Sequence, residues 1–501
     1  MKILFVASEG LPFSKTGGLA DVLEALPKAL ALMGHEVAVV LPRYRDTKVS
    51  AVVLPSLTIP LNGGLRFPAV ADGSTVAGVR YYFVDDPEYF DRDQLYAAQG
   101  KDYPDNGERF GEFCKAAVEI SKHVWPADVI HCHDWQTALV PVLLHTLYAS
   151  DPLLQGVPVV FTVHNMGYHG LFSREILTRL GLPESLFHMD ALEFYGKVNY
   201  LKGGLLFADY LTTVSRKYAQ EIQTAEYGHG LEGVIRGRAD RLRGILNGVD
   251  YSAWSPEEDT FIAAQYSARD LSGKRVCKKD LLEQFRLPGA ELSRPLIGIV
   301  SRFADQKGFD LIAQVAQELL RTDLTIVALG TGDPKYEALF RDLAARFPDK
   351  IGLKIGFDNA LAHKIEAGAD MFLMPSRYEP CGLNQIYSLR YGTIPVVRAT
   401  GGLDDTIEPF DPRSGVGTGF RFEAYDGRAL LTCLRQALTV YGDAAAWRKV
   451  QANGMAKDFS WNVSAAEYVR LYDTARKARI PRAADSSNQF WAEALVPSSR
   501  N

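Results

Sequence analysis

Cysteine is scarce in this sequence, and no two cysteines stand at the spacing of a CxxC pair. The 5 cysteines are scattered along the 501 residues: Cys114, Cys132, Cys277, Cys381 and Cys433. An odd number of unpaired cysteines argues against a disulfide framework, and the missing CxxC spacing argues against a zinc site.

Long apolar runs are also missing. The chain passes from Met1 directly into a strand-like run, KILFVA, which is too short for a signal peptide. No stretch approaches the length of a membrane span. The net charge of −5 is small for 501 residues and argues against general binding to nucleic acid or to membrane surfaces. We therefore expect a cytoplasmic protein without nucleic-acid or membrane partners, in which any phosphate site is built locally.

What the sequence does contain is an alternation of short apolar runs with helical patterns. The runs in the first half are Ile3–Ala7, Glu36–Leu41, Asp128–His133, Pro158–Val163 and Tyr210–Val214. Those in the second half are Leu296–Ser301, Leu324–Leu329, Gly352–Gly356, Ala369–Met374 and Ile394–Val397. Strands that alternate with helices predict parallel βαβ units. Two such series predict an α/β protein with two doubly wound, Rossmann-like domains that face each other across a cleft.

Changes in pattern give the expected domain boundaries. The first domain takes residues 1–246, with a β insertion near 50–86. The second domain takes residues 247–458, and we interpret 247–294 as the interdomain linker and the start of that domain. The last residues, 481–501, are small and polar, which is typical of a disordered tail.

The stretch after the apolar run that ends at Met374 combines an acid with a predicted helix start. Pro380 suits the first turn of a helix, and Gly382 lets the backbone approach a ligand. The free N–H groups of such a helix form an anion site, and Glu379 stands just before it. An acid beside an anion site indicates chemistry on a phosphorylated substrate. Strand–loop–helix junctions are common, however, and the stretch alone leaves a role as a helix-dipole partner open.

A second candidate phosphate site follows the first predicted strand, in the sequence Lys15-Thr16-Gly17-Gly18. Gly17 and Gly18 would expose backbone N–H groups to a phosphate, and Lys15 would add a positive charge. The surrounding sequence is neither GxGxxG nor a Walker A loop, which argues against a dinucleotide dehydrogenase. A glycine turn with a solvated lysine remains the alternative.

Two basic residues, Arg302 and Lys307, follow the predicted strand Leu296–Ser301. At the carboxyl end of a strand they could hold a diphosphate and stabilise it as a leaving group. Lone basic residues in such loops are usually solvated. Together with the helix start near Pro380, however, they could bind both phosphates without a metal.

A group of histidines and acids follows two further predicted strands. It comprises His131, His133, Asp134, His164 and Asn165. No second cluster completes a set of metal ligands, so we predict no metal site. We expect these polar groups to line the cleft and to hydrogen-bond sugar hydroxyls.

Seven motifs together resemble the bacterial glycogen synthase and starch synthase family. They are KTGGLADV (Lys15–Val22), HCHDWQT (His131–Thr137), HN (His164-Asn165), NGVD (Asn247–Asp250), SRFADQKG (Ser301–Gly308), PSRYEPCGLNQ (Pro375–Gln385) and TGGLDDT (Thr400–Thr406). They occur in the order of the family, and the resemblance extends to about Arg479.

The resemblance implies a retaining glycosyltransferase of the two-domain GT-B type. Such an enzyme transfers glucose from ADP-glucose to the non-reducing 4-OH of an α-1,4-glucan such as glycogen, with no cofactor. It also implies that a final helix, near 459–480, returns to the first domain.

The family's site residues carry over to matching positions of this chain. Phosphate-binding residues correspond to Lys15, Gly18, Arg302 and Lys307, and residues around the glucose to Asp134 and His164. The donor-site loop corresponds to Glu379, Cys381, Gly382 and Leu383, and a cleft residue at the hinge to Asn247. Three positions depart from related families: Phe357 replaces a tyrosine expected to stack on adenine, Tyr387 replaces a second glutamate, and Asn384 replaces a common threonine.

Several alternatives remain open. The donor could be UDP-glucose, or the protein could bind glucan without catalysis. A two-domain oxidoreductase is disfavoured by the missing GxGxxG. Glu379 could be a covalent nucleophile or a ligand of sugar hydroxyls. We favour front-face attack, in which the leaving phosphate takes the acceptor proton.

Overall fold

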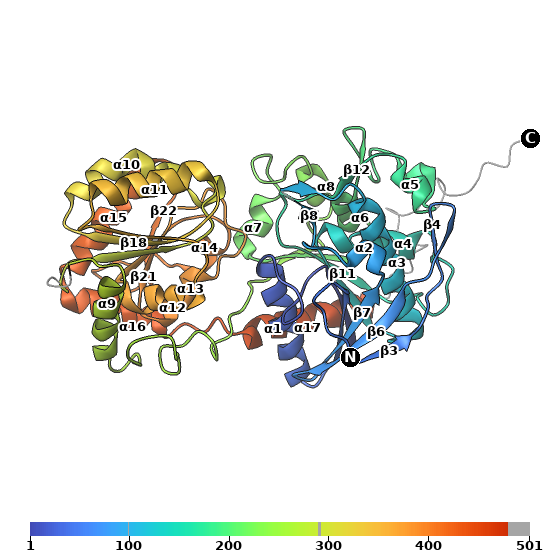
Figure 1. Ribbon diagram of the computed structural model, residues 1–501, viewed down its shortest axis with the longest axis horizontal. Coiled ribbons are helices and arrows are strands. Elements are labelled where there is room, and N and C mark those ends of the chain that lie inside the picture. The colour runs from blue at the N-terminus through green and yellow to red at the C-terminus, as the bar shows by residue number, and fades with distance from the viewer. Residues whose placement is uncertain (99, 289–291, 479–501) are drawn as a thin grey trace, which may run out of the picture. The chain divides into compact units, whose positions relative to one another are not determined.

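The computed structural model describes residues 1–98, 100–288 and 292–478, so the predicted tail at 481–501 lies outside the described residues. The chain forms two compact units (Figure 1). The first comprises Met1–Val214, Ala219–Ile245 and the chain from Trp461 onward, and the second comprises Ser215–Tyr218 and Leu246–Ser460. The short segment Ser215–Tyr218, which the sequence places in the first domain, thus groups with the second unit.

The first unit is built on a nine-stranded sheet. In spatial order its strands are β16 (Leu242–Gly244), β15 (Tyr210–Thr213), β11 (Val159–Val163), β10 (Val129–His133), β1 (Lys2–Val6), β2 (Glu36–Pro42), β7 (Val79–Asp85), β6 (Ala69–Val76) and β3 (Ala51–Leu54). The strands from β16 to β7 are parallel, whereas β6 and β3 are antiparallel. The predicted β insertion therefore extends the main sheet instead of forming a separate subdomain.

Helices cover this sheet in layers. The longer ones are α1 (Gly18–Leu32), α3 (Asn106–His123), α4 (Leu139–His145), α6 (Tyr200–Phe207) and α17 (Trp461–Ala478). Helices α1 and α17 lie side by side and share one apolar core with β1, β2 and β7. Helices α3, α4 and α6 contact one another in series. The chain thus returns to the first unit with its last described helix.

Shorter helices and strands lie in the connecting segments of the first unit. They are α2 (Pro87–Phe90), α5 (Ile176–Arg179), α7 (Arg216–Glu221), α8 (Glu232–Arg236), the hairpins β4 (Ile59–Leu61) with β5 (Gly64–Arg66) and β8 (Ala97–Ala98) with β9 (Lys101–Asp102), and the small sheet β12 (Leu171–Phe172), β14 (Lys197–Asn199) and β13 (Glu193–Phe194). The first turn of α7 belongs to the second unit.

The second unit is built on a six-stranded sheet whose strands are all parallel. In spatial order they are β19 (Ile351–Ile355), β18 (Thr325–Gly330), β17 (Leu296–Val300), β20 (Met371–Met374), β21 (Ile394–Arg398) and β22 (Phe420–Phe422). The ten strands predicted in the two halves are confirmed, and their ends differ by at most two residues. Buried apolar runs of this length are reliable signals because both faces of a parallel sheet are covered.

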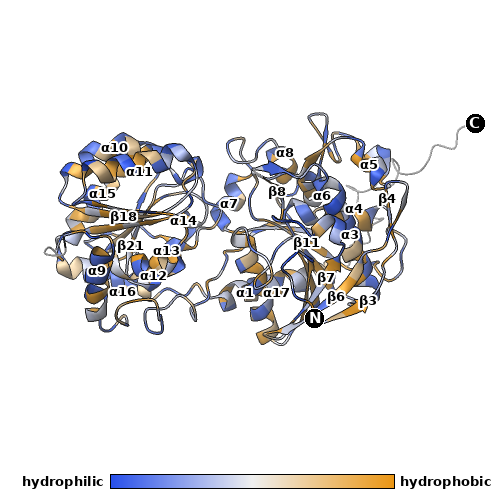
Figure 2. Ribbon diagram, in the orientation of Figure 1, coloured by the Kyte–Doolittle hydropathy of each residue, from blue (hydrophilic) through white to orange (hydrophobic). Residues whose placement is uncertain are grey.

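Helices lie on both faces of the second sheet (Figure 1). They are α9 (Ser272–Gln284), α10 (Phe309–Arg321), α11 (Pro334–Arg346), α12 (Asn359–Gly368), α13 (Asn384–Arg390), α14 (Gly401–Thr406), α15 (Gly427–Tyr441) and α16 (Ala444–Met455). One core joins the sheet to α10, α11 and α15, and a second joins it to α9, α12 and α13. In Figure 2 the strands are mostly hydrophobic in colour, while the helices carry both colours, as two covered faces require.

The described part of the segment 247–294, residues 247–288 and 292–294, belongs to the second unit. The ring of Trp254 stacks between His363, at 3.7 Å, and Tyr387, at 4.0 Å. The buried carboxylate of Asp259 accepts hydrogen bonds from His363 Nδ1 (2.8 Å) and the hydroxyl of Tyr391 (2.6 Å). The start of the second domain at residue 247 agrees with the boundary of the second unit at Leu246. The linker part of the interpretation does not hold at Trp254 and Asp259, because stacking and hydrogen bonds fix these residues to α12 and α13.

Each sheet contains one point at which the direction of strand order reverses. In the first unit the chain runs outward from β1 through β2 and returns to place β10 on the other side of β1. In the second unit β17 is flanked in the same way by β18 and β20. Crevices at the carboxyl ends of strands at such points are the usual ligand sites of open α/β sheets.

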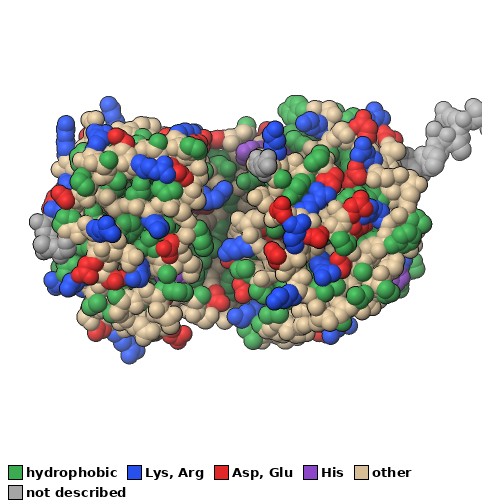
Figure 3. Space-filling view, viewed as in Figure 1, with side chains coloured by type: hydrophobic (Ala, Val, Ile, Leu, Met, Phe, Trp, Pro, Cys, Tyr) green, Lys and Arg blue, Asp and Glu red, His purple; other side chains and the backbone are tan. Residues whose placement is uncertain are grey.

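The surface of each unit mixes charges of both signs. Figure 3 shows Lys and Arg interspersed with Asp and Glu on the visible face of both units. No helix in the described part of the chain combines the length and the apolar character needed to cross a bilayer.

Candidate functional site

The loops after β17 and β20 are joined at the reversal point of the second sheet. The backbone N–H of Arg377 donates to the carbonyl of Gln306 at 2.8 Å. The side chain of Asn384, at the start of α13, donates to the carbonyl of Val300 at 2.7 Å. Asn384, which departs from the common threonine, thus ties the helix start to the end of β17. The two loops form one scaffold.

A buried ion pair lies within this scaffold. Lys307 Nζ donates to Glu379 Oε2 at 2.6 Å, and Ser376 Oγ donates to the same oxygen at 3.0 Å. The side chains of Lys307 and Glu379 are only 17% and 8% exposed. Glu379 Oε1 has no partner among the described residues. One carboxylate oxygen is therefore fixed and the other is available to a ligand.

Glycines let a neighbouring segment support the loop that carries Glu379. Gly402 N–H donates to the carbonyl of Glu379 at 3.0 Å. A Cβ atom at Gly402 would lie 1.9 Å from the carbonyl oxygen of Cys381, and one at Gly401 would lie 2.0 Å from that of Glu379. Only glycine permits this approach, which accounts for the Gly-Gly sequence at the start of α14.

The helix predicted to begin near Pro380 begins instead at Asn384. Gly382 has a φ of +68°, and Leu383 has a φ of −122° and a ψ of −33°, outside the range of a regular helix, so the chain becomes helical only after them. Pro380 lies in the loop, and the prediction that it occupies the first helical turn is wrong. Cys381 is buried in the same loop, and burial raises the pKa of its thiol to about 12.

Arg302 and Phe357 are the exposed members of the candidate site in the second unit. Arg302 follows β17, and its guanidinium has no partner among the described residues. Phe357 follows β19 and is 91% exposed. An aromatic ring left this free at the carboxyl end of a strand is available for stacking on a planar ligand.

Asn247 lies near this loop as well. It is 7% exposed, and its Oδ1 atom is buried without a hydrogen-bond partner among the described residues. A backbone contact of Asn247 favours the thiolate of Cys381, which places the two residues together. The structure thus brings Asn247 to the loop of Glu379, as the resemblance implies.

In the first unit, a histidine pair and a strained aspartate stand at the carboxyl ends of β10 and β11. His133 Nδ1 lies 3.0 Å from His164 Nε2. Burial lowers the pKa of His164 to about 3, so this pair is neutral at pH 7 and one ring donates to the other. Asp134 has a φ of +56° and accepts a hydrogen bond from His164 N–H at 2.7 Å. Burial raises the pKa of Asp134 to about 7.

His131 does not line this site. It is fully buried, and its ring nitrogens contact the hydroxyls of Tyr472, at 2.7 Å, and Thr162, at 2.6 Å. The expectation that it hydrogen-bonds sugars is wrong, because its position on β10 points it toward α17. Only Asp134, His164 and Asn165 of the predicted group are partly exposed.

The Lys15-Thr16-Gly17-Gly18 loop differs from its prediction. The N–H groups of Thr16 and Gly17 donate to the carboxylate of Glu9 at 2.8 and 3.1 Å. Lys15 Nζ is paired with Asp21 Oδ1 at 2.6 Å. The expectation that this loop offers free N–H groups is therefore wrong for Gly17, whereas Gly18 lies exposed at the start of α1.

Family models match both units. One described as starch synthase catalytic domain matches residues 2–237, and one described as glycosyl transferases group 1 matches residues 283–452. The glycogen synthase of Koribacter versatilis is 58% identical over 483 residues, which cover 96% of this chain and 99% of that protein. The chain belongs to the glycogen and starch synthase family.

Further relatives agree with this assignment. Glycogen synthase 1 of Geobacter metallireducens is 48% identical and aligns over 96% of this chain and 97% of its own length. The catalytic domain of starch synthase IV from Arabidopsis thaliana, solved with ADP and acarbose, matches with a TM-score of 0.86 and 35% identity, covering 95% of this chain and 99% of that one. This member of the family is a glycosyltransferase with the GT-B fold.

Sequence reasoning missed two residues of the candidate site, Glu9 and Ser376. It also missed the pairing of His133 with His164. Ser376 stands three residues before Glu379, a spacing that lets a hydroxyl reach back to the same carboxylate. Glu9 stands directly after the first strand, where an acid facing a glycine loop is a readable signal. The pairing of His133 with His164 depends on two adjacent strands and has no local signal.

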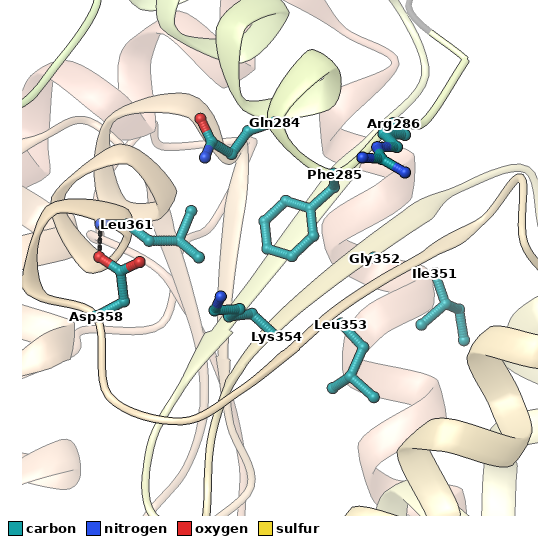
Figure 4. A pocket seen from close by; sticks show the side chains of 9 residues that line it. All are labelled: Gln284, Phe285, Arg286, Ile351, Gly352, Leu353, Lys354, Asp358 and Leu361. Carbon is teal, nitrogen blue, oxygen red and sulfur yellow. Dashed lines mark hydrogen bonds between the residues drawn. The ribbon is translucent and has the colours of Figure 1, made fainter.

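A cavity in the second unit lies apart from these residues. It has a volume of about 230 Å³ and lies beside the edge strand β19 and the end of α9 (Figure 4). Phe285 and Leu361 line it, with the polar ends of Gln284 and Lys354 between them. Among the described residues no group of three or more His, Cys, Asp or Glu side chains is placed to hold a metal ion.

Proposed function

We propose that this glycosyltransferase elongates an α-1,4-glucan such as glycogen. It transfers glucose from ADP-glucose to the non-reducing 4-OH, retains the α-configuration and releases ADP. The Lys307–Glu379 pair at the reversal point of the second sheet carries the proposal, because it puts a cation and a carboxylate where a sugar diphosphate would bind. The ADP bound to the related starch synthase IV supports this choice of nucleotide.

The diphosphate would be held by Lys307 and Arg302. A lysine ammonium has three donors, and one of them is taken by Glu379. The remaining donors of Lys307 and the free guanidinium of Arg302 can hydrogen-bond phosphate oxygens. Two positive charges supply the stabilisation that a divalent cation gives in other enzymes, and we propose that no metal and no other cofactor is needed.

The adenine would stack on Phe357. The ring is 91% exposed and its loop follows β19, the edge strand of the second sheet. A phenyl ring provides a stacking surface without a hydroxyl contact. A purine offers a larger face to such a ring than a uracil does, which supports ADP-glucose over UDP-glucose.

Glu379 would hold glucose hydroxyls through its Oε1 atom. Its Oε2 atom is engaged by Lys307 and by Ser376. A charge-paired and doubly hydrogen-bonded carboxylate is a weak nucleophile, because these bonds stabilise its ground state. We therefore assign it to orienting the sugar, not to a covalent intermediate.

Front-face attack then accounts for retention. The acceptor 4-oxygen bonds to the anomeric carbon on the face from which the diphosphate leaves, as the bond from that carbon to the phosphate oxygen breaks. The proton of the acceptor hydroxyl passes to the departing phosphate. Lys307 and Arg302 stabilise the charge that develops on the diphosphate, and water must be excluded to prevent hydrolysis of the donor.

Polar and basic residues of the first unit also suit parts of the substrates. Asp134 and His164 are partly exposed at the ends of β10 and β11 and suit sugar hydroxyls. Lys15 and Gly18 lie at the start of α1 and suit a phosphate. The donor loop in the second unit would be shaped by Asn247, Cys381, Gly382 and Leu383.

The five cysteines are free and buried, which supports a cytoplasmic location.

The experiment that tests this function is nucleotide release from each sugar nucleotide, with and without glycogen. ADP release from ADP-glucose that depends on glycogen, and persists with excess chelator, is the expected result. Release of UDP at equal or higher kcat/KM would refute the donor. Activity that disappears with chelator and returns with magnesium would refute metal independence, and glycogen binding without release of either nucleotide would leave only a binding protein.

A further inference from the structure

Glu9 is a buried carboxylate that the proposed reaction does not use. It is 2% exposed, and no cation among the described residues pairs with it. Its oxygens instead accept hydrogen bonds from Thr16 N–H (2.8 Å), Thr16 Oγ1 (2.6 Å) and Gly17 N–H (3.1 Å). The hydroxyl of Tyr96 lies 3.3 Å away. Burial raises its pKa, so this carboxylate is costly to keep charged and needs these donors.

The segment between Glu9 and Thr16 is a closed turn. Gly10 N–H donates to the carbonyl of Ser14 at 3.1 Å, and Ser14 N–H donates back to that of Gly10 at 3.0 Å. Lys15 follows this turn and precedes the two residues that Glu9 holds. Its position is therefore set from both sides, by the turn and by the carboxylate.

We propose that Glu9 is a positioning residue that holds the Lys15-Thr16-Gly17 segment so that Lys15 can contact the donor phosphate. The proposal rests on the proposed function. Because the carboxylate already occupies the N–H groups of Thr16 and Gly17, these groups are not available to a phosphate. A phosphate bound at this loop would therefore contact Lys15 and the start of α1 at Gly18, and not the N–H groups of Thr16 and Gly17.

The present partner of Lys15 is compatible with this role. Asp21 contacts Lys15 Nζ at 2.6 Å, but the two side chains are 47% and 38% exposed. Exposed pairs of this kind contribute little, so the ammonium can exchange Asp21 for a phosphate at small cost. The buried contacts of Glu9 are stronger, because a charged acceptor in a low-dielectric environment gains more from each donor.

A double-mutant cycle tests the proposal. Glu9→Gln keeps the size of the side chain but replaces one acceptor oxygen with an amide donor that faces backbone N–H groups. We expect kcat/KM for ADP-glucose to fall about tenfold in the parent chain, mainly through KM, and by less than about twofold in a Lys15→Ala background. Such coupling is not produced by a change that only destabilises the fold.

The control is Glu112→Gln, since Glu112 is a fully buried carboxylate on α3 outside the site. The effects of Glu112→Gln and Lys15→Ala on kcat/KM should be additive. If Glu9→Gln fails to fold, Thr16→Val removes the hydroxyl donor to Glu9 and takes its place in the cycle. Equal losses in both backgrounds, an unchanged or higher kcat/KM in the single variant, or no effect of Lys15→Ala would each overturn the proposal. A parent chain that releases no ADP refutes the function instead.

Discussion

The two units of the chain share a sheet architecture but use their reversal points differently. In the second unit the point between β17 and β20 holds the Lys307–Glu379 ion pair, and Arg302 after β17 and Phe357 after β19 are exposed. In the first unit the point between β1 and β10 holds Glu9, whose hydrogen bonds go to its own loop. The second unit leaves the Arg302 guanidinium and the Phe357 ring exposed, while in the first unit the buried carboxylate of Glu9 is satisfied by its own loop.

This difference indicates a division of labour. Side chains without internal partners are available to a ligand, and in the second unit they suit a nucleotide diphosphate. In the first unit the neutral pair His133–His164 and the protonatable Asp134 suit hydroxyl groups, which need donors and acceptors rather than charge. Substitutions in each unit can test this division.

Removing the carboxylate of the second unit should have the largest effect. Glu379→Gln keeps a carbonyl oxygen for the sugar but leaves Lys307 without its charged partner. We expect kcat to fall on the order of 10²- to 10⁴-fold, the range of a positioned catalytic contact, with an α-linked product. Kinetics and NMR of the product check both points.

The alternative role of Glu379 has a distinct signature. Activity at background level together with a trapped glycosyl ester on Glu379 would establish a covalent nucleophile and contradict front-face attack. Ser376→Ala provides a milder companion, because it removes one of the two hydrogen bonds to Oε2 and leaves the ion pair. Its loss should be smaller than that of Glu379→Gln.

Lys307→Ala should cost about 3 kcal/mol or more of transition-state stabilisation, similar to the loss of one preorganised oxyanion donor. The change also leaves the buried Glu379 carboxylate unpaired. We expect kcat to fall, because charge develops on the diphosphate only in the transition state. The matched control is Lys335→Ala, whose ion pair with Asp305 is exposed and should not matter. A change confined to KM would show that Lys307 only binds the donor.

Phe357→Ala should raise KM for ADP-glucose about tenfold with kcat nearly unchanged, since stacking of a base on an aromatic ring contributes roughly 1–3 kcal/mol. The thermal stability should not change, because the ring is 91% exposed. Tyr195→Ala is the control in the first unit, where Tyr195 is 85% exposed. Equal effects of the two variants would remove the proposed division between the units.

The strands and most helices follow from the sequence, because buried apolar runs and their spacing are local signals. The residue at which a helix begins after a turn does not follow from such signals. Gly382 adopts a positive φ and delays α13 to Asn384, a choice that Pro380 alone does not reveal. Lys307 and Glu379 lie in contact, as expected for residues that follow two adjacent strands of the second sheet.

The site in the first unit was harder to predict. His131 is a polar residue within the buried strand β10, and Glu9 is a polar residue that follows β1. The ring of His131 hydrogen-bonds to Tyr472, whereas Glu9 binds its own loop. Sequence gives the residue type but not the direction of the side chain or the partner that reaches it from α17. The packing of Trp254 was missed for the same reason, since its ring stacks on residues more than a hundred positions away.

The smallest effect concerns the pH dependence of stability contributed by Asp134. Burial raises the pKa of this carboxyl to about 7, above its ordinary value near 4. Between these values the folded chain keeps a proton that the unfolded chain has lost. The contribution of Asp134 to stability therefore decreases as the pH rises from about 4 to about 7 and is constant above that.

Asp134→Asn should remove this contribution while preserving the local geometry. Asparagine tolerates the φ of +56°, and its Oδ1 atom can accept the hydrogen bond from His164 N–H. We expect the Tm of the variant relative to the parent chain to increase between about pH 5 and about pH 7 and then to level off. Thermal unfolding across this range provides the measurement. A difference in Tm that stays constant or decreases with pH would show that Asp134 is ionised throughout, and the first unit would then present a permanent charge to its ligand rather than a neutral hydrogen-bonding surface.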